Sequence, residues 1–320
     1  MGFFLEELEK RFHSGPLAED KLDDSLELVF DDEPLERILY GEELPGPTVA
    51  NLFLPGFKYV EQISQACKGG DIQQALKKLC EYQREKYPLS LRMCYRLTAS
   101  IKDFVPNFPN PRLEHDLTPL GPMLEEMWQL ALKGDDKRLQ QELGTVLYRW
   151  YEHYQHYEDA RGVLTVLIDI TRERGERANE AVMLNNFAFE YLLEEKWQEA
   201  IPLFEQAAKM FEDKGDEYEY ANARANYWTC RFECDDLDNL EEIEEELKKL
   251  RDVLSGRTGW HARKPLVLLA KLEEQGGNSE DAIKLVKEAI EASRGSNTRY
   301  PELDANYLRD LKRSERTSET

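Results

Sequence analysis

A small set of polar side chains in the second half of the chain has the types and the spacing needed to bind a peptide. Asn186 and Asn226 lie 40 residues apart, and Asn222 precedes Asn226 by one helical turn. An asparagine amide both donates and accepts hydrogen bonds, so a row of asparagines can bind the backbone of an extended peptide whatever its sequence. Arg149 and Lys264 could add recognition of a carboxylate. The alternative is that the asparagines bond to neighbouring hairpins.

An aromatic cluster at residues 147–160, LYRWYEHYQHYEDA, offers a second contact chemistry. Its rings are distributed around a helix, so we expect about half of them to pack in a core. We predict that Trp150, Tyr151 and Tyr154 form an aromatic contact surface, because Tyr and Trp are enriched at interfaces. His153 and His156 are three residues apart, but no third ligand is suitably spaced, so we predict no metal site.

Catalytic motifs do not accompany these residues. The chain has no GxxxxGK[ST] phosphate loop, no GxGxxG after a strand, no HExxH and no GxSxG. Pairs of carboxylates are uninformative in a chain with 64 Asp and Glu residues. We therefore expect a non-enzymatic protein without a cofactor, and an enzyme of unrecognised type remains the alternative.

Charge and composition restrict the partner. The formal net charge of −22 disfavours binding to nucleic acid, which requires clustered Lys and Arg. The acidic excess is concentrated in residues 1–45, which could form an arm for a basic partner or simply aid solubility. No apolar run approaches the roughly 18 residues of a membrane span, and no signal segment is visible. Five cysteines without a CxxC pair are typical of reduced thiols, so we expect a cytoplasmic protein.

The elements that position these side chains are predicted to be helices throughout. Apolar residues recur at spacings of three and four, strand signals are almost absent, and the fold class is therefore all-α. We predict five regions: an acidic N-terminal region with short helices (1–55), a helical hairpin around Gly69-Gly70 plus a helix from Leu89 to Phe104 (56–105), a proline-rich connection (106–122), helical repeats (123–293), and a C-terminal helix with a polar tail that frays from Leu311 (294–320).

An internal repeat of about 40 residues organises the longest region. Ala160, Ala200, Leu240 and Ala282 lie at intervals of 40, 40 and 42 residues, and the neighbouring apolar positions keep step. Each repeat reads as two helices joined by a short polar turn, and stacking such hairpins buries a continuous core. Small alanines at these positions allow the helices to cross closely.

The best-preserved repeat resembles a known family. Leu184-x2-Phe187-Ala188-x2-Tyr191, followed by Ala200-x3-Phe204 and Ala207, is similar to the tetratricopeptide repeat (TPR) consensus, in the long-repeat form of about 40 residues found among bacterial sensor and adaptor proteins. The 240 repeat departs from the pattern, with Leu240 for Ala and Glu244 for Phe. The resemblance implies an α-α superhelix whose first helices line a concave groove.

Two functions follow from this resemblance. The first is a non-enzymatic scaffold or adaptor that binds another protein or peptide segment in the groove, with no direct contact to nucleic acid or membrane. In this reading Arg149, Asn186, Asn222, Asn226 and Lys264 face the ligand, although Val146 and Leu268 occupy the equivalent of Asn186 in flanking repeats. The alternative is a peptide-sensing regulator whose N-terminal helical region contacts a target protein.

Overall fold

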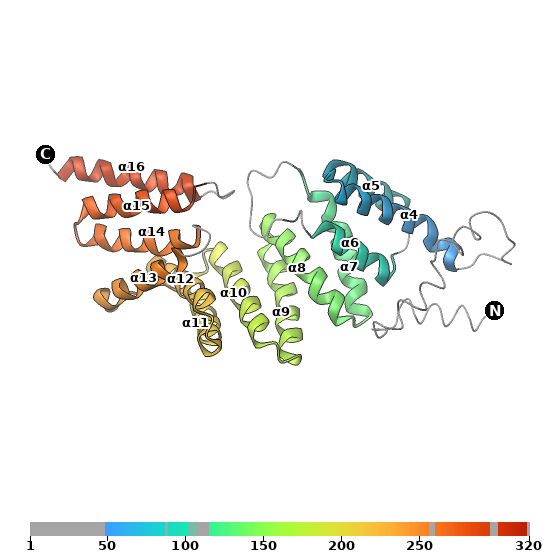
Figure 1. Ribbon diagram of the computed structural model, residues 1–320, viewed down its shortest axis with the longest axis horizontal. Helices are drawn as coiled ribbons and strands as arrows, with labels where there is room; N and C mark the ends of the chain where they lie inside the picture. The colour runs from blue at the N-terminus through green and yellow to red at the C-terminus, as the bar shows by residue number, and fades with distance from the viewer. Residues whose placement is uncertain are drawn as a thin grey trace. The chain divides into compact units, whose positions relative to one another are not determined.

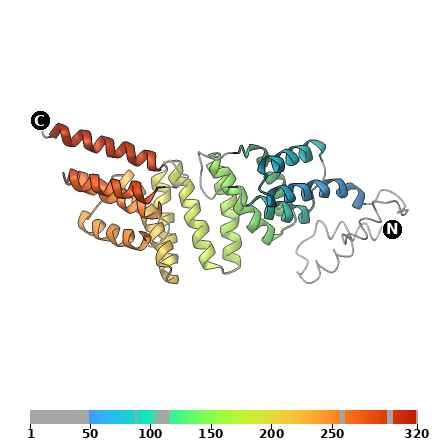
Figure 2. The same ribbon diagram turned by 45° about the horizontal axis from the view of Figure 1, so that its top comes forward.

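A computed structural model describes residues 49–86, 89–102, 105, 115–255, 260–294 and 300–318 (Figures 1 and 2). These residues form thirteen α-helices and one short 3-10 helix, and they contain no strand. The all-α prediction is therefore confirmed. Nearly all of the predicted acidic region, with its short helices at Phe3–Phe12 and Leu35–Tyr40, lies outside the described residues, as does the segment 106–114.

The described chain divides into two compact units, the first ending at Trp150 and the second beginning at Tyr151. The division falls within helix α8 (Lys137–His153). It therefore lies later in the chain than the proline-rich segment after which we predicted the repeats to begin.

The first unit is a set of short helices around one core. It holds α4 (Val49–Lys68), α5 (Ile72–Glu85), α6 (Leu91–Ile101), the 3-10 helix η1 (Thr118–Leu120), α7 (Gly121–Lys133) and α8 as far as residue 150. The predicted hairpin around Gly69-Gly70 is α4–α5. Helix α6 starts two residues later than the predicted Leu89, because the Ser90 hydroxyl caps its first turn by accepting a 3.3 Å bond from the amide of Met93, and it ends at Ile101 rather than Phe104.

Trp150 fills the core of this first unit. Its indole Nε1 donates a 2.9 Å hydrogen bond to the carbonyl of Leu117, just before η1. Gly121 lies directly against the ring, and a Cβ added at Gly121 would come within 2.4 Å of a ring carbon of Trp150. Only a glycine fits at this position of α7.

The second unit is a series of antiparallel helix pairs. After the end of α8 it contains α9 (Tyr157–Glu173), α10 (Arg177–Leu193), α11 (Trp197–Lys214), α12 (Glu217–Glu233), α13 (Leu240–Ser255), α14 (Trp260–Gln275), α15 (Ser279–Ala292) and α16 (Tyr300–Ser318). Consecutive helices pack against each other along the series (Figure 1). This is the stacking that the 40-residue period predicts.

Helix α16 closes the end of the stack. Leu311 is buried against Ala282 and Val286. On the neighbouring helix α14, the Nε and Nη2 atoms of Arg263 donate 2.6 and 2.5 Å bonds to the carboxylate of Asp304, in a pair that is almost fully buried. The tail that we predicted to fray from Leu311 instead stays helical to Ser318, because these contacts hold the helix onto its neighbours.

Most of the helices in the described ranges end in the same backbone turn. After α10, Glu195 adopts a left-handed φ of 60°, and the amide of Lys196 donates a 2.9 Å bond to the carbonyl of Tyr191, five residues back. This is a Schellman motif, and Lys196 is already the N-cap of α11. The same left-handed position recurs after α4, α7, α8, α9, α11, α12 and α14, at Gly70, Asp135, Gln155, Gly175, Gly215, Asp235 and Gly277.

One turn is longer, and it shifts the repeat. Residues 194–196 connect α10 to α11, whereas residues 234–239 connect α12 to α13. Ala200 is the fourth residue of its helix, but Leu240 is the first residue of α13, so Ile243 takes the place of the alanine. The prediction that Leu240 takes the repeat position of Ala200 was therefore wrong: its side chain is 47% exposed, whereas Ile243 is buried.

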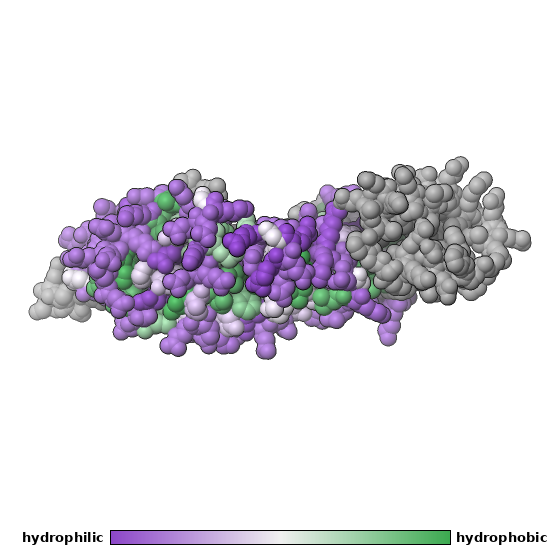
Figure 3. All heavy atoms as spheres, turned by 90° about the horizontal axis from the view of Figure 1, so that it is seen from below, coloured by the Kyte–Doolittle hydropathy of each residue, from purple (hydrophilic) through white to green (hydrophobic). Residues whose placement is uncertain are grey.

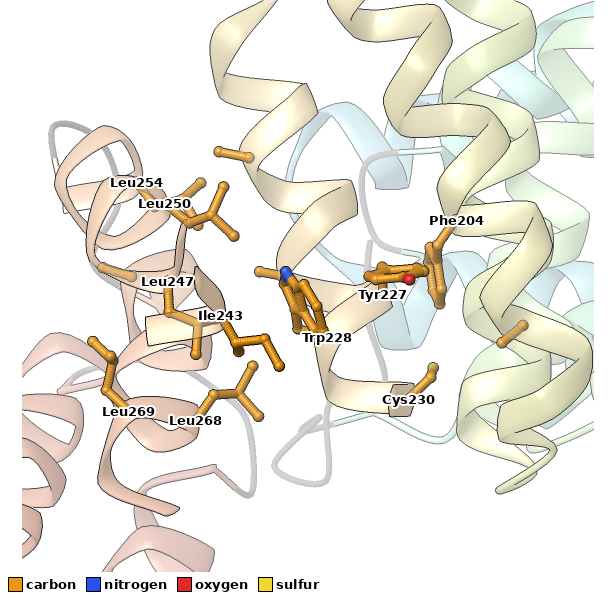
Figure 4. Close-up of a cluster of buried hydrophobic side chains, with 14 of the residues drawn as sticks. Phe204, Tyr227, Trp228, Cys230, Ile243, Leu247, Leu250, Leu254, Leu268 and Leu269 are labelled. Atoms are coloured by element: carbon orange, nitrogen blue, oxygen red, sulfur yellow. The ribbon is translucent and has the colours of Figure 1, made fainter. Parts of the chain in front are cut away.

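A large cluster of buried side chains extends from α10 to α14 in the second unit. Figure 4 shows Tyr227 lying against Phe204, and Trp228 directed toward the aliphatic side chains of α13 and α14. Fully buried alanines at Ala188, Ala200 and Ala225 complete the packing. Their methyl side chains allow the helix axes to approach closely, as the sequence pattern predicts.

Candidate functional site

The first helices of the hairpins form a continuous face in the second unit. Helix α12 contacts both α10 and α14, although neither follows it directly in sequence. Direct contact between first helices is typical of a stack in which they lie on the inner side of the curve. We call this surface the inner face and define it by Asn186 and Phe189 of α10, Tyr218, Asn222 and Asn226 of α12, and His261 and Lys264 of α14.

Lys264 ties three helices together on the inner face. Its Nζ donates a hydrogen bond to Asn226 Oδ1 and a longer one, of 3.5 Å, to Asn222 Oδ1. The same Nζ lies 5.6 Å from the ring centroid of Phe189. The side chain is only 9% exposed. Two neutral amide oxygens and an aromatic ring are among its neighbours.

This environment favours the neutral amine form of Lys264 over its ammonium form. Burial lowers the pKa of its ammonium group from 10.5 to about 7, and the positive charge of Arg263 lowers it further. The negative charge of Glu219 acts in the opposite direction. Because the pKa is close to neutral, small changes around Lys264 change its charge.

Tyr218 and His261 form a second polar pair in the first turns of α12 and α14. The Tyr218 hydroxyl lies 2.6 Å from His261 Nδ1, and the two rings stack at 5.5 Å between centroids. Burial and the nearby Lys264 lower the pKa of His261 to about 4, so the ring is neutral at pH 7. A neutral ring that accepts the Tyr218 O–H at Nδ1 carries its proton on Nε2.

The structure brings together three of the five predicted groove residues, namely Asn222, Asn226 and Lys264. Asn226 is only 2% exposed, and its Oδ1 accepts a hydrogen bond from Lys264 of the next hairpin. This contact is the bonding between hairpins that we gave as the alternative to ligand binding. Asn186 is half-buried on α10. Arg149 belongs to the first unit, where its guanidinium lies 5.9 Å from the ring centroid of Tyr148. A role in ligand binding stays a prediction for all five.

The aromatic contact surface is smaller than predicted. Trp150 and Tyr151 are 6% and 9% exposed, so they present almost no area to a partner. Tyr154 is half-buried, with its ring 4.9 Å from that of His153. The helical spacing alone does not separate these positions, because the aromatic residues near the end of α8 point in different directions around the helix.

Sequence reasoning missed Phe189, Tyr218 and His261. Tyr218 lies four residues before Asn222 and therefore on the same side of α12, which is a signal that the sequence does contain. His261 lies 43 residues after Tyr218, close to the repeat period. The stacking of these two side chains depends on the contact between α12 and α14, which spacing alone does not describe.

The face in Figure 3 is predominantly hydrophilic, with hydrophobic residues in separate spots. Within the described ranges, none of the helices combines the length and the apolar character that crossing a membrane requires.

Comparison with known proteins identifies the fold but no family. No family model matches the chain, and no curated protein matches it. Among solved structures, 81% of the chain is similar to the Signal Transduction ATPase with Numerous Domains (STAND) protein with a tetratricopeptide repeat sensor from Pyrococcus horikoshii, with a TM-score of 0.56 and 16% identity. The fold is a helical repeat. BtubC from P. vanneervenii matches 79% of this chain over 93% of its own length, with a TM-score of 0.48 and 12% identity.

The similarity to the STAND protein concerns part of a larger molecule. The chain covers 39% of the length of that protein. At 16% identity the similarity shows the arrangement of helices alone. It supports the predicted TPR-like superhelix.

Proposed function

We propose that the chain is a non-enzymatic scaffold or adaptor that binds a protein or peptide segment on the inner face. The contact of Lys264 with Asn222 supports this best, because it places the half-buried amide of Asn222 beside an amino group on the inner face. Asn222 is half-buried, and its amide nitrogen makes no hydrogen bond within the described part of the chain. Such a donor can bind the carbonyl of an extended peptide.

The solved structures are compatible with a recognition role. The tetratricopeptide repeat of the STAND protein from Pyrococcus horikoshii is a sensor. A stack of hairpins offers an extended surface, and that surface suits a segment of protein better than a small molecule.

The test is a pair of substitutions on the inner face. Peptides selected from a random display library on the full chain would be titrated against the wild type and against a double variant, Asn186→Ala with Asn222→Ala. We expect about tenfold weaker binding or more, which corresponds to about 1.4 kcal/mol. Asn226 is kept unchanged, because its removal would leave the buried Lys264 without its nearest acceptor.

The matched control is Asn306→Ala, which makes the same change on the exposed side of α16. It should bind the peptides like the wild type, and all variants should keep the same helicity. Equal affinity of the double variant and the wild type would remove the inner face as the binding surface.

A second candidate function is peptide sensing, with residues 1–105 contacting a target protein. The division of the described chain into two compact units favours this candidate, because binding at one unit can then change the position of the other. A selected peptide should contract the small-angle scattering profile of the full chain. A profile that stays the same with the peptide bound would argue against sensing.

A further inference from the structure

One asparagine of the second unit has a buried oxygen atom without a hydrogen bond. The side chain of Asn185, on α10, is only 8% exposed, and its Oδ1 atom is buried and has no hydrogen-bond partner. Most buried polar atoms in proteins are bonded, because an unpaired acceptor keeps the full cost of losing its water. The presence of an asparagine at this position therefore requires an explanation.

The next hairpin shows that the fold does not need an asparagine at this position. Ala225 of α12 lies 40 residues after Asn185, which is the repeat period, and its methyl side chain is fully buried. Asn226, the following residue, is also buried, but its Oδ1 accepts a hydrogen bond from Lys264. The repeat thus accepts an alanine where Asn185 stands, and a buried asparagine elsewhere in the repeat is bonded.

Asn185 lies beside the polar groups of the inner face. It precedes Phe189 by one helical turn, so the two side chains share a side of α10. The ring centroid of Phe189 lies 5.6 Å from Nζ of Lys264, which bonds to Asn222 of α12. Helices α10 and α12 also contact each other directly. Asn185 and Asn222 therefore lie on two touching helices, next to the same lysine and aromatic ring.

These two side chains complement the main chain of an extended segment. Oδ1 of Asn185 lacks a donor, and the amide nitrogen of Asn222 makes no hydrogen bond within the described residues. In an extended chain the N–H and the C=O of one residue point to the same side, so a single residue supplies both a donor and an acceptor. A cationic side chain supplies donors alone and would leave the amide of Asn222 unpaired.

We propose that Asn185 is a ligand-binding residue, and that together with Asn222 it binds the N–H and C=O of one residue of an extended segment. This inference rests on the proposed function. A change of rotamer is enough to turn the short Asn185 side chain from the helix contact toward the surface. The segment then supplies the hydrogen bond that Oδ1 lacks in the free chain, and this adds to the affinity.

The first experiment measures the stability of the free full-length chain and needs no ligand. Asn185→Ala copies the alanine of the next hairpin and removes the unpaired oxygen, so its thermal midpoint should rise by about 2 °C. Asn226→Ala is the matched comparison, because it also replaces a buried asparagine but removes an acceptor of Lys264, and its midpoint should fall. A lower midpoint for Asn185→Ala would show that this side chain supports the free fold and would overturn the proposal.

The second experiment measures binding of the peptides selected on the full chain. Asn185→Ala should bind them about tenfold more weakly than the wild type. Asn306→Ala, on the exposed side of α16, should bind like the wild type. A purely structural residue would lower stability and affinity together, whereas we expect Asn185→Ala to raise the first and lower the second.

Ester substitution in the peptide identifies the main-chain group that binds Asn185. Each backbone N–H is replaced in turn by an ester oxygen, which removes one donor. At one position the substitution should weaken binding to the wild type about fivefold and have no effect on binding to Asn185→Ala, because the two changes remove the same hydrogen bond. Asn222→Ala should remain sensitive at that position.

The outcomes separate this inference from the proposed function. If the double variant Asn186→Ala with Asn222→Ala binds like the wild type, the inner face is not the binding surface and both proposals fail. If that double variant is weakened while Asn185→Ala binds like the wild type, the proposed function stands and the role of Asn185 is overturned. Equal sensitivity of the wild type and Asn185→Ala at every ester position would also overturn it.

Discussion

Lys264 couples the stability of the second unit to pH. Its pKa is about 7 in the folded chain, against 10.5 for an ordinary lysine. Between these two values the unfolded chain binds a proton that the folded chain does not. Stability therefore rises with pH across this window, because the unfolded state holds more protons.

Replacing Lys264 should remove this dependence. We expect Lys264→Met, which keeps the length of the side chain, to flatten the slope by about 1 kcal/mol per pH unit between the two pKa values. Denaturant unfolding at several pH values measures the slope. Lys249→Met changes an exposed lysine of α13 and should keep the wild-type slope. A Lys264→Met slope equal to that of the wild type would show that Lys264 is protonated in the folded chain.

Single residues of the candidate site were only partly predictable. The repeat period places Asn226 and Lys264 among the polar positions of the first helices. The hydrogen bond from Lys264 to Asn226 forms because the long lysine side chain extends from α14 to α12. The repeat period does not predict such a contact between two helices. The burial of Trp150 depends equally on a contact outside its helix, with Gly121.

At the scale of the elements, the recurrent turn requires one residue to adopt a left-handed backbone conformation. Glycine occupies the left-handed position at Gly175 and Gly277, whereas Glu195 and Gln155 adopt the same conformation with a side chain. A left-handed φ costs a residue other than glycine roughly 1–2 kcal/mol. The sequence indicates the glycine turns directly, but nothing in the local composition marks Glu195 as left-handed.

Exchanging the two residue types should move stability in opposite directions. We expect Glu195→Gly to stabilise the fold by about 0.5–1 kcal/mol, since relief of strain exceeds the added freedom of the unfolded chain. Gly175→Ala should destabilise it by about 1 kcal/mol, although a Cβ there meets no atom within 4 Å. Thermal unfolding of both variants measures the effects. Equal midpoints for the two variants would contradict the strained backbone.

The register of the repeats shows where element-level prediction ends. Helices were predictable because apolar residues recur with the period of a helix. The exposed position of Leu240 was not predictable. A longer α12–α13 turn shifts the whole of α13 along the sequence but does not change the spacing of apolar residues within either helix. Ile243, three residues later, continues the same pattern equally well.

At the scale of the whole molecule, the stability of each compact unit can be tested with its own substitution. Gly121 packs against the Trp150 ring in the first unit, and in the second unit Arg263 binds Asp304 of helix α16. We expect Gly121→Ala to cost about 1–3 kcal/mol through overpacking. Asp304→Asn should cost about 3 kcal/mol, because it leaves a nearly buried guanidinium without its partner.

Hydrogen exchange locates these two losses. Gly121→Ala should lower the protection of amides between residues 115 and 150, and Asp304→Asn that of amides between residues 260 and 318. The two-unit description would be contradicted if both variants lowered protection equally along the whole chain. The division inside α8 was not predictable, because the helix itself continues through it.

The longer connection between α12 and α13 also has a practical consequence. Here the chain accommodates three more residues than at the α10–α11 turn while the buried positions of α13 are retained. The backbone between Leu237 and Asp238 is thus the natural place to graft a foreign segment, such as an epitope or a fluorescent reporter. Because loop extension costs little entropy, such a fusion should leave the hairpins on either side assembled.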